Sequence, residues 1–324
     1  MTALRWLGFG VLGLVSVVAS GAAYVRLAYP KVGAAPATVV ERTDEKRARG
    51  AYLAEHVAMC VDCHSERDYT RYSAPVRPGS FGQGGERFGR DLGMPGELVA
   101  GNITPHALGS WSDGEIMRAL TTGVTRDGRA LFPLMNYPGY ATLCRSDLEA
   151  LVVYLRGLPS IASEPAATEL DFPVNLIVRT LPKEAQTPAH CPDPQDTVAY
   201  GRYLVGIAGC ADCHTPRKGG DLVPELAFSG GVPLPAPAGG IMPSANITPD
   251  EKTGIGSWSR EAFIQRFAMY RDSANLAPVE PNGRSTLMPW SMFAGMTDAD
   301  LGAMYDYLRT VKPIETGAAH VAAR

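Results

Sequence analysis

The chain has 324 residues, of which 45% are hydrophobic and 19% are charged, and this is the composition of ordinary globular material. A net charge of −3 excludes a strongly basic surface, so we expect no nucleic-acid partner. Thirty-five glycines and 26 prolines favour long irregular loops between helices over extended sheets. The length is sufficient for two domains of ordinary size.

The N-terminal region contains an uncharged, mostly apolar stretch over residues 6–25, bracketed by Arg5 and Arg26. Twenty such residues match the length of a membrane-spanning helix, whereas the core of a signal peptide is usually shorter. We therefore expect residues 1–30 to form one transmembrane anchor. The small-residue run ASGAA leaves the alternative of a signal peptide that is cleaved near Ala22.

Two short segments, CVDCH and CADCH, each place two cysteines three residues apart with a histidine directly after them. Such a pair can be half of a zinc site, a dithiol redox centre or the attachment site of a c-type haem. Zinc would require a second pair near each segment, and a dithiol centre would require an alternation of strands and helices that the sequence lacks. Haem attachment explains every residue, because the thiols form thioethers and the imidazole binds the iron. The sequence predicts two covalently bound haem c groups on Cys60, Cys63, Cys210 and Cys213, with His64 and His214 as proximal iron ligands.

An internal repeat organises the rest of the chain. RGAYLAEHVAMCVDCH matches YGRYLVGIAGCADCH with a one-residue slip, and GNITPHALGSWS matches ANITPDEKTGIGSWS. Both halves close with apolar residues at i, i+3, i+4 and i+7, starting at Leu148 and at Leu301, which indicates one face of a helix. The repeat predicts an all-α chain of two tandem haem domains, over residues 44–160 and 193–316, with a linker over 161–192.

The repeat also selects the distal iron ligands. Met135 lies thirteen residues before Leu148, and Met288 lies thirteen before Leu301. Each follows a leucine and precedes an aromatic residue by two positions, whereas the other methionines have no such counterpart. A thioether is a soft axial ligand that raises the potential of a haem. We therefore predict axial ligation by Met135 and Met288, with packing in the core as the alternative.

Other repeated polar residues suggest contacts with the haem edge. Ionised propionates need hydrogen-bond donors, and an indole N–H and an amide can supply them. The alternative is that the tryptophans fill the core and the asparagines hold a turn before a proline. Both roles remain open for Asn102, Trp111, Asn246 and Trp258.

Two cysteines remain outside the motifs, Cys144 and Cys191. In an oxidising compartment two leftover cysteines suggest a disulfide, and this one would tie the linker back to the first domain. Two separate buried thiols are the alternative.

These motifs together resemble a known family. Gly-x-Tyr-Leu before each cysteine motif, the Asn-Ile-Thr-Pro loops and the methionine before the last helix are similar to the cytochrome c subunits of membrane-bound alcohol and gluconate dehydrogenases. The resemblance covers roughly residues 44–316. It implies two class I cytochrome c folds, His/Met ligation of both irons and electron transfer from a dehydrogenase.

Three functions are compatible with these features. The first is a periplasm-facing di-haem cytochrome c, not an enzyme, which relays electrons from a dehydrogenase or other respiratory donor towards a terminal acceptor. The second is a haem subunit of a terminal oxidase complex. The third is a di-haem cytochrome c peroxidase, although an enzyme of this class needs an open iron position and both halves offer a methionine. Because c-type haems are attached outside the cytoplasmic membrane, we expect a single-pass protein of the bacterial inner membrane, or a soluble periplasmic one after cleavage.

Overall fold

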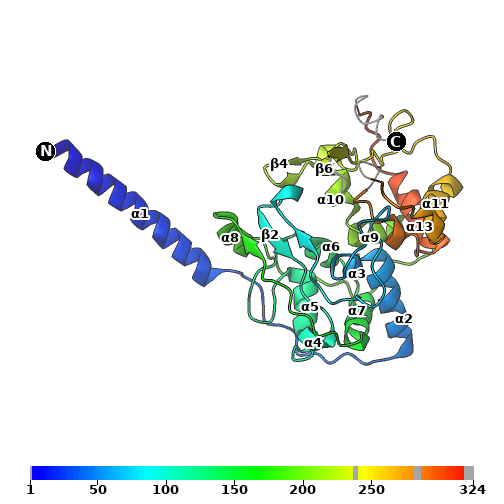
Figure 1. The fold of residues 1–324 in the computed structure, drawn as a ribbon, viewed down its shortest axis with the longest axis horizontal. Helices are drawn as coiled ribbons and strands as arrows, with labels where there is room; N and C mark the ends of the chain where they lie inside the picture. The colour runs from blue at the N-terminus through cyan, green and yellow to red at the C-terminus, as the bar shows by residue number, and fades with distance from the viewer. Residues whose placement is uncertain (1, 236–239, 281–285, 317–324) are drawn as a thin grey trace.

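Two crossed helix pairs, one in each half of the chain, organise the structure (Figure 1). In the first half (residues 44–160), α2 (Asp44–Tyr52) packs against α7 (Arg145–Gly157). In the second half (residues 193–316), α9 (Thr197–Ile207) packs against α13 (Asp298–Leu308). Of these helices, α7 and α13 are the ones whose apolar faces the repeat predicts at the end of each half. The structure is a computed structural model that describes residues 2–235, 240–280 and 286–316.

A glycine allows each pair to cross closely. A Cβ on Gly50 of α2 would lie 2.6 Å from the carbonyl carbon of Ala150, and a Cβ on Gly201 of α9 would lie 2.5 Å from that of Ala303. Ordinary van der Waals contact begins near 3.4 Å, so only a residue without a Cβ fits at either position. The repeated Gly-x-Tyr-Leu pattern is therefore the sequence signature of the helix crossing.

The one-residue slip between the halves is absorbed by a π-helix over Leu53–Val57. The N–H of Ala58 donates to the carbonyl oxygen of Leu53 at 2.7 Å, a bond that spans five residues instead of four. Past this bulge the cysteine motifs form equivalent short helices. These are α3 (Cys60–Cys63) and α10 (Cys210–His214).

Short strands correct the prediction of an all-α fold. The loops after each motif contain antiparallel pairs, and β2 (Gly96–Val99) lies between β1 (Arg87–Phe88) and β3 (Glu169–Leu170) in a three-stranded sheet. Main-chain polar groups of long loops need hydrogen-bond partners, and neighbouring loop segments provide them. Periodicity does not reveal strands of two to four residues. The other strands are β4 (Arg217–Lys218), β5 (Asp221–Leu222), β6 (Pro233–Pro235) and β7 (Ile241–Pro243).

Other helices connect these parts. They are α4 (Pro105–Leu108), α5 (Asp113–Thr122), α6 (Tyr137–Tyr140), α8 (Val174–Ile177), α11 (Arg260–Ala268) and α12 (Trp290–Phe293). Short 3-10 segments lie at Arg90–Leu92, Val178–Thr180, Pro224–Leu226, Met269–Arg271 and Ser273–Asn275.

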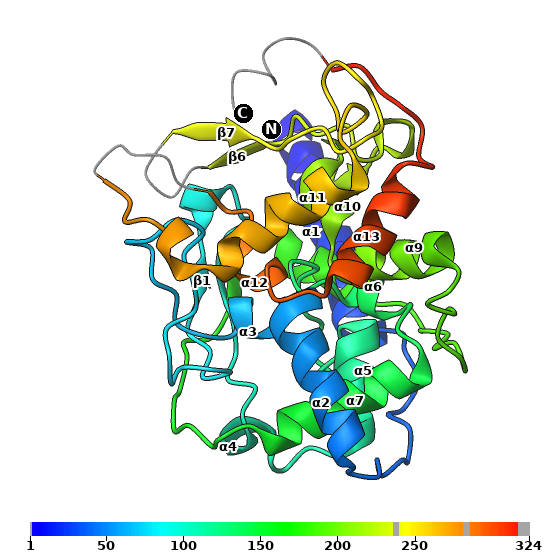
Figure 2. The same ribbon diagram turned by 90° about the vertical axis from the view of Figure 1, so that its right-hand side faces the viewer.

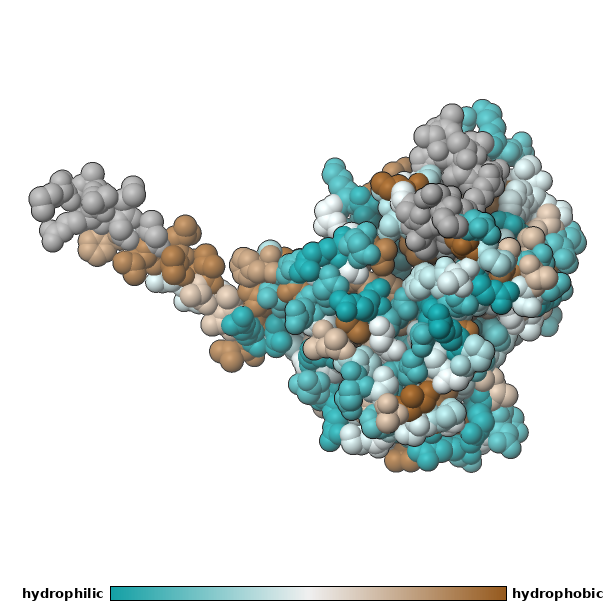
Figure 3. Space-filling model, viewed as in Figure 1, coloured by the Kyte–Doolittle hydropathy of each residue, from teal (hydrophilic) through white to brown (hydrophobic). Residues whose placement is uncertain are grey.

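The N-terminal helix α1 (Thr2–Ala28) extends away from the rest of the molecule, and its described part carries exposed apolar side chains (Figures 1 and 3). The prediction of a membrane-spanning helix is nevertheless wrong. In the part of the chain that the structure describes, no helix has both the length and the apolar character needed to cross a membrane.

One hydrophobic core runs through both halves. It includes Leu53 and Leu151 of the first half and Leu204 and Leu301 of the second, all almost fully buried. Figure 2 shows α2 and α7 of the first half in the lower part of the molecule, with α11 and α13 of the second half above them. The halves therefore pack on each other, and the domain boundaries expected from the repeat stay a prediction.

Candidate functional site

The histidine of each cysteine motif makes the same main-chain contact. His64 Nδ1 lies 2.7 Å from the carbonyl oxygen of Gly101, and His214 Nδ1 lies 2.7 Å from that of Ala245. A ring nitrogen that faces a carbonyl oxygen carries the proton, so Nε2 keeps its lone pair. Burial lowers the pKa of both histidines, which favours the neutral ring. This is the tautomer and the backbone partner typical of a histidine that binds a metal through Nε2.

Those carbonyl groups belong to the residues directly before the repeated Asn-Ile-Thr-Pro loops. The side-chain oxygen of Asn102, like that of Asn246, accepts from both the N–H and the hydroxyl of the threonine two residues later. The Asn102 amide donates to the carbonyl oxygen of Ile161 at 2.8 Å, and the Asn246 amide to that of Ile314 at 2.7 Å. Both asparagines thus join the loop to the chain that follows the last helix of their half. Their contact with a propionate stays a prediction.

A glycine in each half seats this loop against the histidine. The N–H of Gly84 donates to the carbonyl oxygen of His64 at 2.8 Å, and the N–H of Gly230 donates to that of His214 at 2.8 Å. Both glycines have positive φ, +74° and +71°, and a Cβ on either would lie 2.6 Å from the main-chain nitrogen of the loop asparagine. Sequence reasoning missed them because the two loops differ in length. The Gly-Gly dipeptides at 84–85 and 230–231 were the available signal.

The motif cysteines are free of disulfides, and burial raises the pKa of Cys60 and of Cys210 to about 12. A dithiol redox centre needs a thiol with a lowered pKa, so these environments do not suit one. Among the described residues one group of three has the spacing of metal ligands, and it lies outside both motifs, so neither motif has the further ligands of a zinc site. Two thiols beside a histidine with a free Nε2 fit a covalently attached haem.

The two candidate distal methionines have matching local structure. The N–H of Tyr137 donates to the carbonyl oxygen of Met135 at 2.6 Å, and the N–H of Trp290 donates to that of Met288 at 2.8 Å. Each tight turn leads into a short helix, α6 or α12, and both methionines are half-buried against the core. Trp111 and Trp258 are also half-buried there. Axial ligation and the tryptophan contacts with a haem stay predictions.

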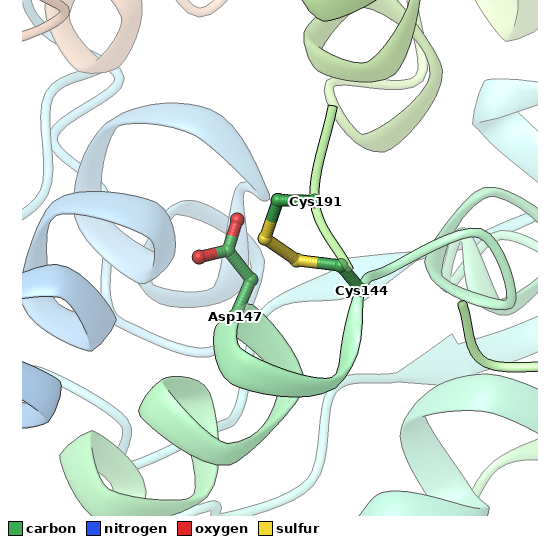
Figure 4. Close-up of side chains that lie close together, drawn as sticks. All are labelled: Cys144, Asp147 and Cys191. Atoms are coloured by element: carbon green, nitrogen blue, oxygen red, sulfur yellow. A yellow bond between two sulfur atoms is a disulfide. The ribbon is translucent and has the colours of Figure 1, made fainter. Parts of the chain in front are cut away.

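The two remaining cysteines, Cys144 and Cys191, form a disulfide (Figure 4). Cys144 is the N-cap of α7, as Thr297 is the N-cap of α13 in the second half. Asp147 lies beside the disulfide, and these three residues are the group with metal-ligand spacing noted above. Because both sulfurs are bonded to each other, the group is no metal site. The disulfide attaches the end of the 161–192 linker to the first half.

Reciprocal tyrosines join the two halves. Tyr52 of α2 donates to Asp300 of α13 at 2.6 Å and accepts the N–H of the α13 N-cap residue at 3.2 Å. Tyr203 of α9 donates to Asp147 of α7 at 2.7 Å and accepts the N–H of the α7 N-cap residue at 3.4 Å. Equivalent residues exchange partners, so the interface has approximate two-fold symmetry. The sequence contains both tyrosines in its repeat, but nothing in it shows that they cross to the other half.

Helices that cross at a glycine, a Cys-x-x-Cys-His motif and an imidazole anchored to a main-chain carbonyl group are together typical of a c-type cytochrome domain. Residues 198–312 match the family model of cytochrome c, a family that implies a covalently bound haem c. The match covers one domain, and it does not support the predicted tandem of two.

The predicted resemblance to dehydrogenase subunits is confirmed. The chain is similar to the gluconate 2-dehydrogenase cytochrome c subunit of Pantoea cypripedii, with 28% identity over 81% of this chain and 59% of that protein. It is similar to the cytochrome c subunit of alcohol dehydrogenase (quinone) of Gluconacetobacter polyoxogenes, with 27% identity over 94% and 63%. A diheme cytochrome c-type protein of Cereibacter sphaeroides is 28% identical over 94% of this chain and 98% of its own length. The chain thus spans about 60% of the length of the dehydrogenase subunits.

Proposed function

We propose that this chain is an electron-transfer protein with two covalently attached haem c groups, and that it relays electrons from a dehydrogenase towards a terminal acceptor. It has no substrate of its own. The observation that carries the proposal is the identical contact in both halves, where Nδ1 of the motif histidine lies 2.7 Å from a carbonyl oxygen. A second haem in the first half is supported by this contact even though the family model matches only the second half.

Each half would hold its haem in the same way. The cysteines supply the thioether links, and the motif histidine supplies Nε2 because its Nδ1 proton is committed to the Asn-Ile-Thr-Pro loop. When bound, a haem supplies one-electron redox chemistry. A methionine on the far side would keep the iron six-coordinate and raise its potential. The residues proposed for these roles are Cys60, Cys63, His64 and Met135, and then Cys210, Cys213, His214 and Met288.

A dehydrogenase is the electron donor best supported by the relatives, because two of them are named as subunits of gluconate and alcohol dehydrogenases. A terminal oxidase would use the same haem chemistry with another partner. A peroxidase would need an open iron position, whereas the matching turns at the two methionines support two closed ones. The disulfide and the haem motifs both suit an oxidising compartment, and we place the haem-bearing part in the periplasm.

The first test counts the haems. The chain is produced in a host that attaches c-type haem, and its mass is compared with those of Cys60→Ala and Cys210→Ala. We expect two haems on the unchanged chain and one on each variant. Cys191→Ser, which changes a cysteine outside the motifs, should keep both haems and serves as the control. A single haem on the unchanged chain would contradict the two-haem proposal.

The second test concerns the donor. The chain is purified from its native host under mild conditions, and the proteins that co-purify are identified by mass spectrometry. We expect the large subunit of a dehydrogenase. An oxidase core subunit in its place would favour the oxidase function, and rapid hydrogen peroxide reduction by the purified chain would favour the peroxidase.

A further inference from the structure

Part of the first half is built into the second. The loop after the first cysteine motif pairs with the second half through main-chain bonds: Val279 N–H donates to Thr70 at 2.7 Å, and Tyr72 N–H donates to Ala277 at 2.9 Å. The ring of Tyr72 stacks on that of Tyr270, with 5.7 Å between centroids. The corresponding loop of the second half forms the β4–β5 hairpin instead. Residues 70–74, which we name the inserted loop, therefore belong in space to the second half.

The inserted loop reaches the main chain of the candidate distal ligand. Ser73 is fully buried, and its hydroxyl donates to the carbonyl oxygen of Met288 at 3.0 Å. The same hydroxyl oxygen accepts the N–H of Ser291 at 3.2 Å. Ser73 and Ala74 have φ of +65° and +42°, a region that residues other than glycine rarely adopt. Such backbone persists only where surrounding contacts hold it in place.

A buried ion pair between Asp62 of the first motif and Arg67 holds this turn. Arg67 donates to the carbonyl oxygen of Ala74 at 2.9 Å and to that of Ser73 at 3.0 Å. Its guanidinium also lies 3.3 Å from the carboxylate of Asp62, and both side chains are only 5% exposed. Asp62 stands between the two cysteines of the first motif. A connected chain of polar contacts therefore runs from the first haem motif to the methionine of the second half.

The equivalent pair in the second half makes no such connection. Arg217 and Asp212 are 2.7 Å apart, but their side chains are 44% and 40% exposed. Arg217 also donates to the carbonyl oxygen of Gly220 within its own hairpin. Burying an ion pair is costly, and among the described residues Asp62 Oδ1 has no hydrogen-bond partner. A buried pair of this kind beside a strained turn points to a task specific to the first half.

We propose that Ser73 is a positioning residue for the second haem, held by Arg67 and Asp62 so that its hydroxyl fixes the main chain of Met288. The inference rests on the proposed axial role of Met288. Its consequence is directional: the ligation of the second haem depends on a residue of the first half. A change at Ser73 should alter the haem of the second half. The haem of the first half, to which Ser73 belongs in the sequence, should be unaffected.

The test removes the hydroxyl in the intact two-haem protein. Ser73→Gly is the main variant because glycine adopts φ near +65° without strain, so loss of the fold is not expected. Ser80→Ala is the matched control: Ser80 is a buried serine of the same half, and its hydroxyl accepts the N–H of Glu66 and donates to the carbonyl oxygens of Glu66 and Arg77. Met288→Ala identifies which potential and which sulfur-to-iron absorption belong to the second haem.

We expect Ser73→Gly to weaken the absorption that Met288→Ala abolishes and to lower the same potential. Loss of the hydrogen bond from Ser73 should make opening of the Met288 segment about fivefold more favourable. Because cyanide binds when this segment is open, the affinity of that haem for cyanide should increase by the same factor. Arg67→Lys, which keeps the charge but loses the guanidinium fork, should shift the same potential by less. Ser80→Ala should shift neither.

Three results would overturn the inference, and only the third is also a failure of the proposed function. If Met288→Ala lowers one potential but Ser73→Gly leaves it unchanged, Ser73 does not position the ligand, and the function stands. If Ser73→Gly and Ser80→Ala shift both potentials equally, the effect is general loosening and the inference is wrong. If Met288→Ala leaves both haem spectra unchanged, the axial assignment itself fails and the inference fails with it.

Discussion

The helix crossing gives a sharp test of why the repeat contains its glycines. In Gly201→Ala the new Cβ would lie 2.5 Å from the carbonyl carbon of Ala303 and 3.0 Å from the Cβ of Tyr307. The first distance is about 0.9 Å short of ordinary contact, and a main-chain atom cannot move aside as the end of a flexible side chain can. Helices α9 and α13 must separate, and overpacking of this kind costs typically 1–3 kcal/mol or more. The better helix propensity of alanine offsets only about 0.5–1 kcal/mol.

The control lies on the same helix. A Cβ on Gly206 would have its nearest neighbour at 4.0 Å, so Gly206→Ala meets no steric conflict. This variant should raise the free energy of unfolding by about 0.5–1 kcal/mol, whereas Gly201→Ala should lower it by about 1–2 kcal/mol. Equilibrium denaturation of the haem-loaded proteins, followed by circular dichroism, measures both. If Gly201→Ala unfolds at the same denaturant concentration as the unchanged chain, the close crossing is not what requires glycine.

Three further predictions follow from the site. Met135→Ala and Met288→Ala should each lower the potential of one haem and open it to cyanide, as seen by redox titration and absorption; ready cyanide binding by the unchanged chain would argue against two closed irons. The pair Cys144→Ser and Cys191→Ser should lose up to about 4 kcal/mol of stability, since the disulfide closes a loop of 47 residues, while both haem spectra persist. Asn246→Ala should cost about 1–3 kcal/mol in denaturant unfolding, because buried groups of its loop and of the C-terminal segment lose their partner. A neutral result there would mean that water replaces the amide without penalty.

Two expectations failed, and the failure of the first has a physical reason. The all-α prediction rested on helical periodicity and on loops rich in glycine and proline, and neither reveals strands as short as β1 or β3. Their pairing depends on which loops the packed helices bring together. The membrane helix was predicted from length and absence of charge, and in the part of the chain that the structure describes no helix is long and apolar enough to cross a membrane.

The sequence by itself determined what is local and repeated. Spacing alone identified the cysteines and histidines of both motifs, the apolar face beginning at Leu148 and its partner in the second half, and the equivalence of the two methionine segments. Only the tertiary structure decided which carbonyl group anchors each histidine, how Tyr52 crosses to the other half, and that Ser73 lies against Met288. Ser73 and Met288 are 215 positions apart. Contacts of that kind depend on how packed helices orient distant loops, which no local pattern of residues encodes.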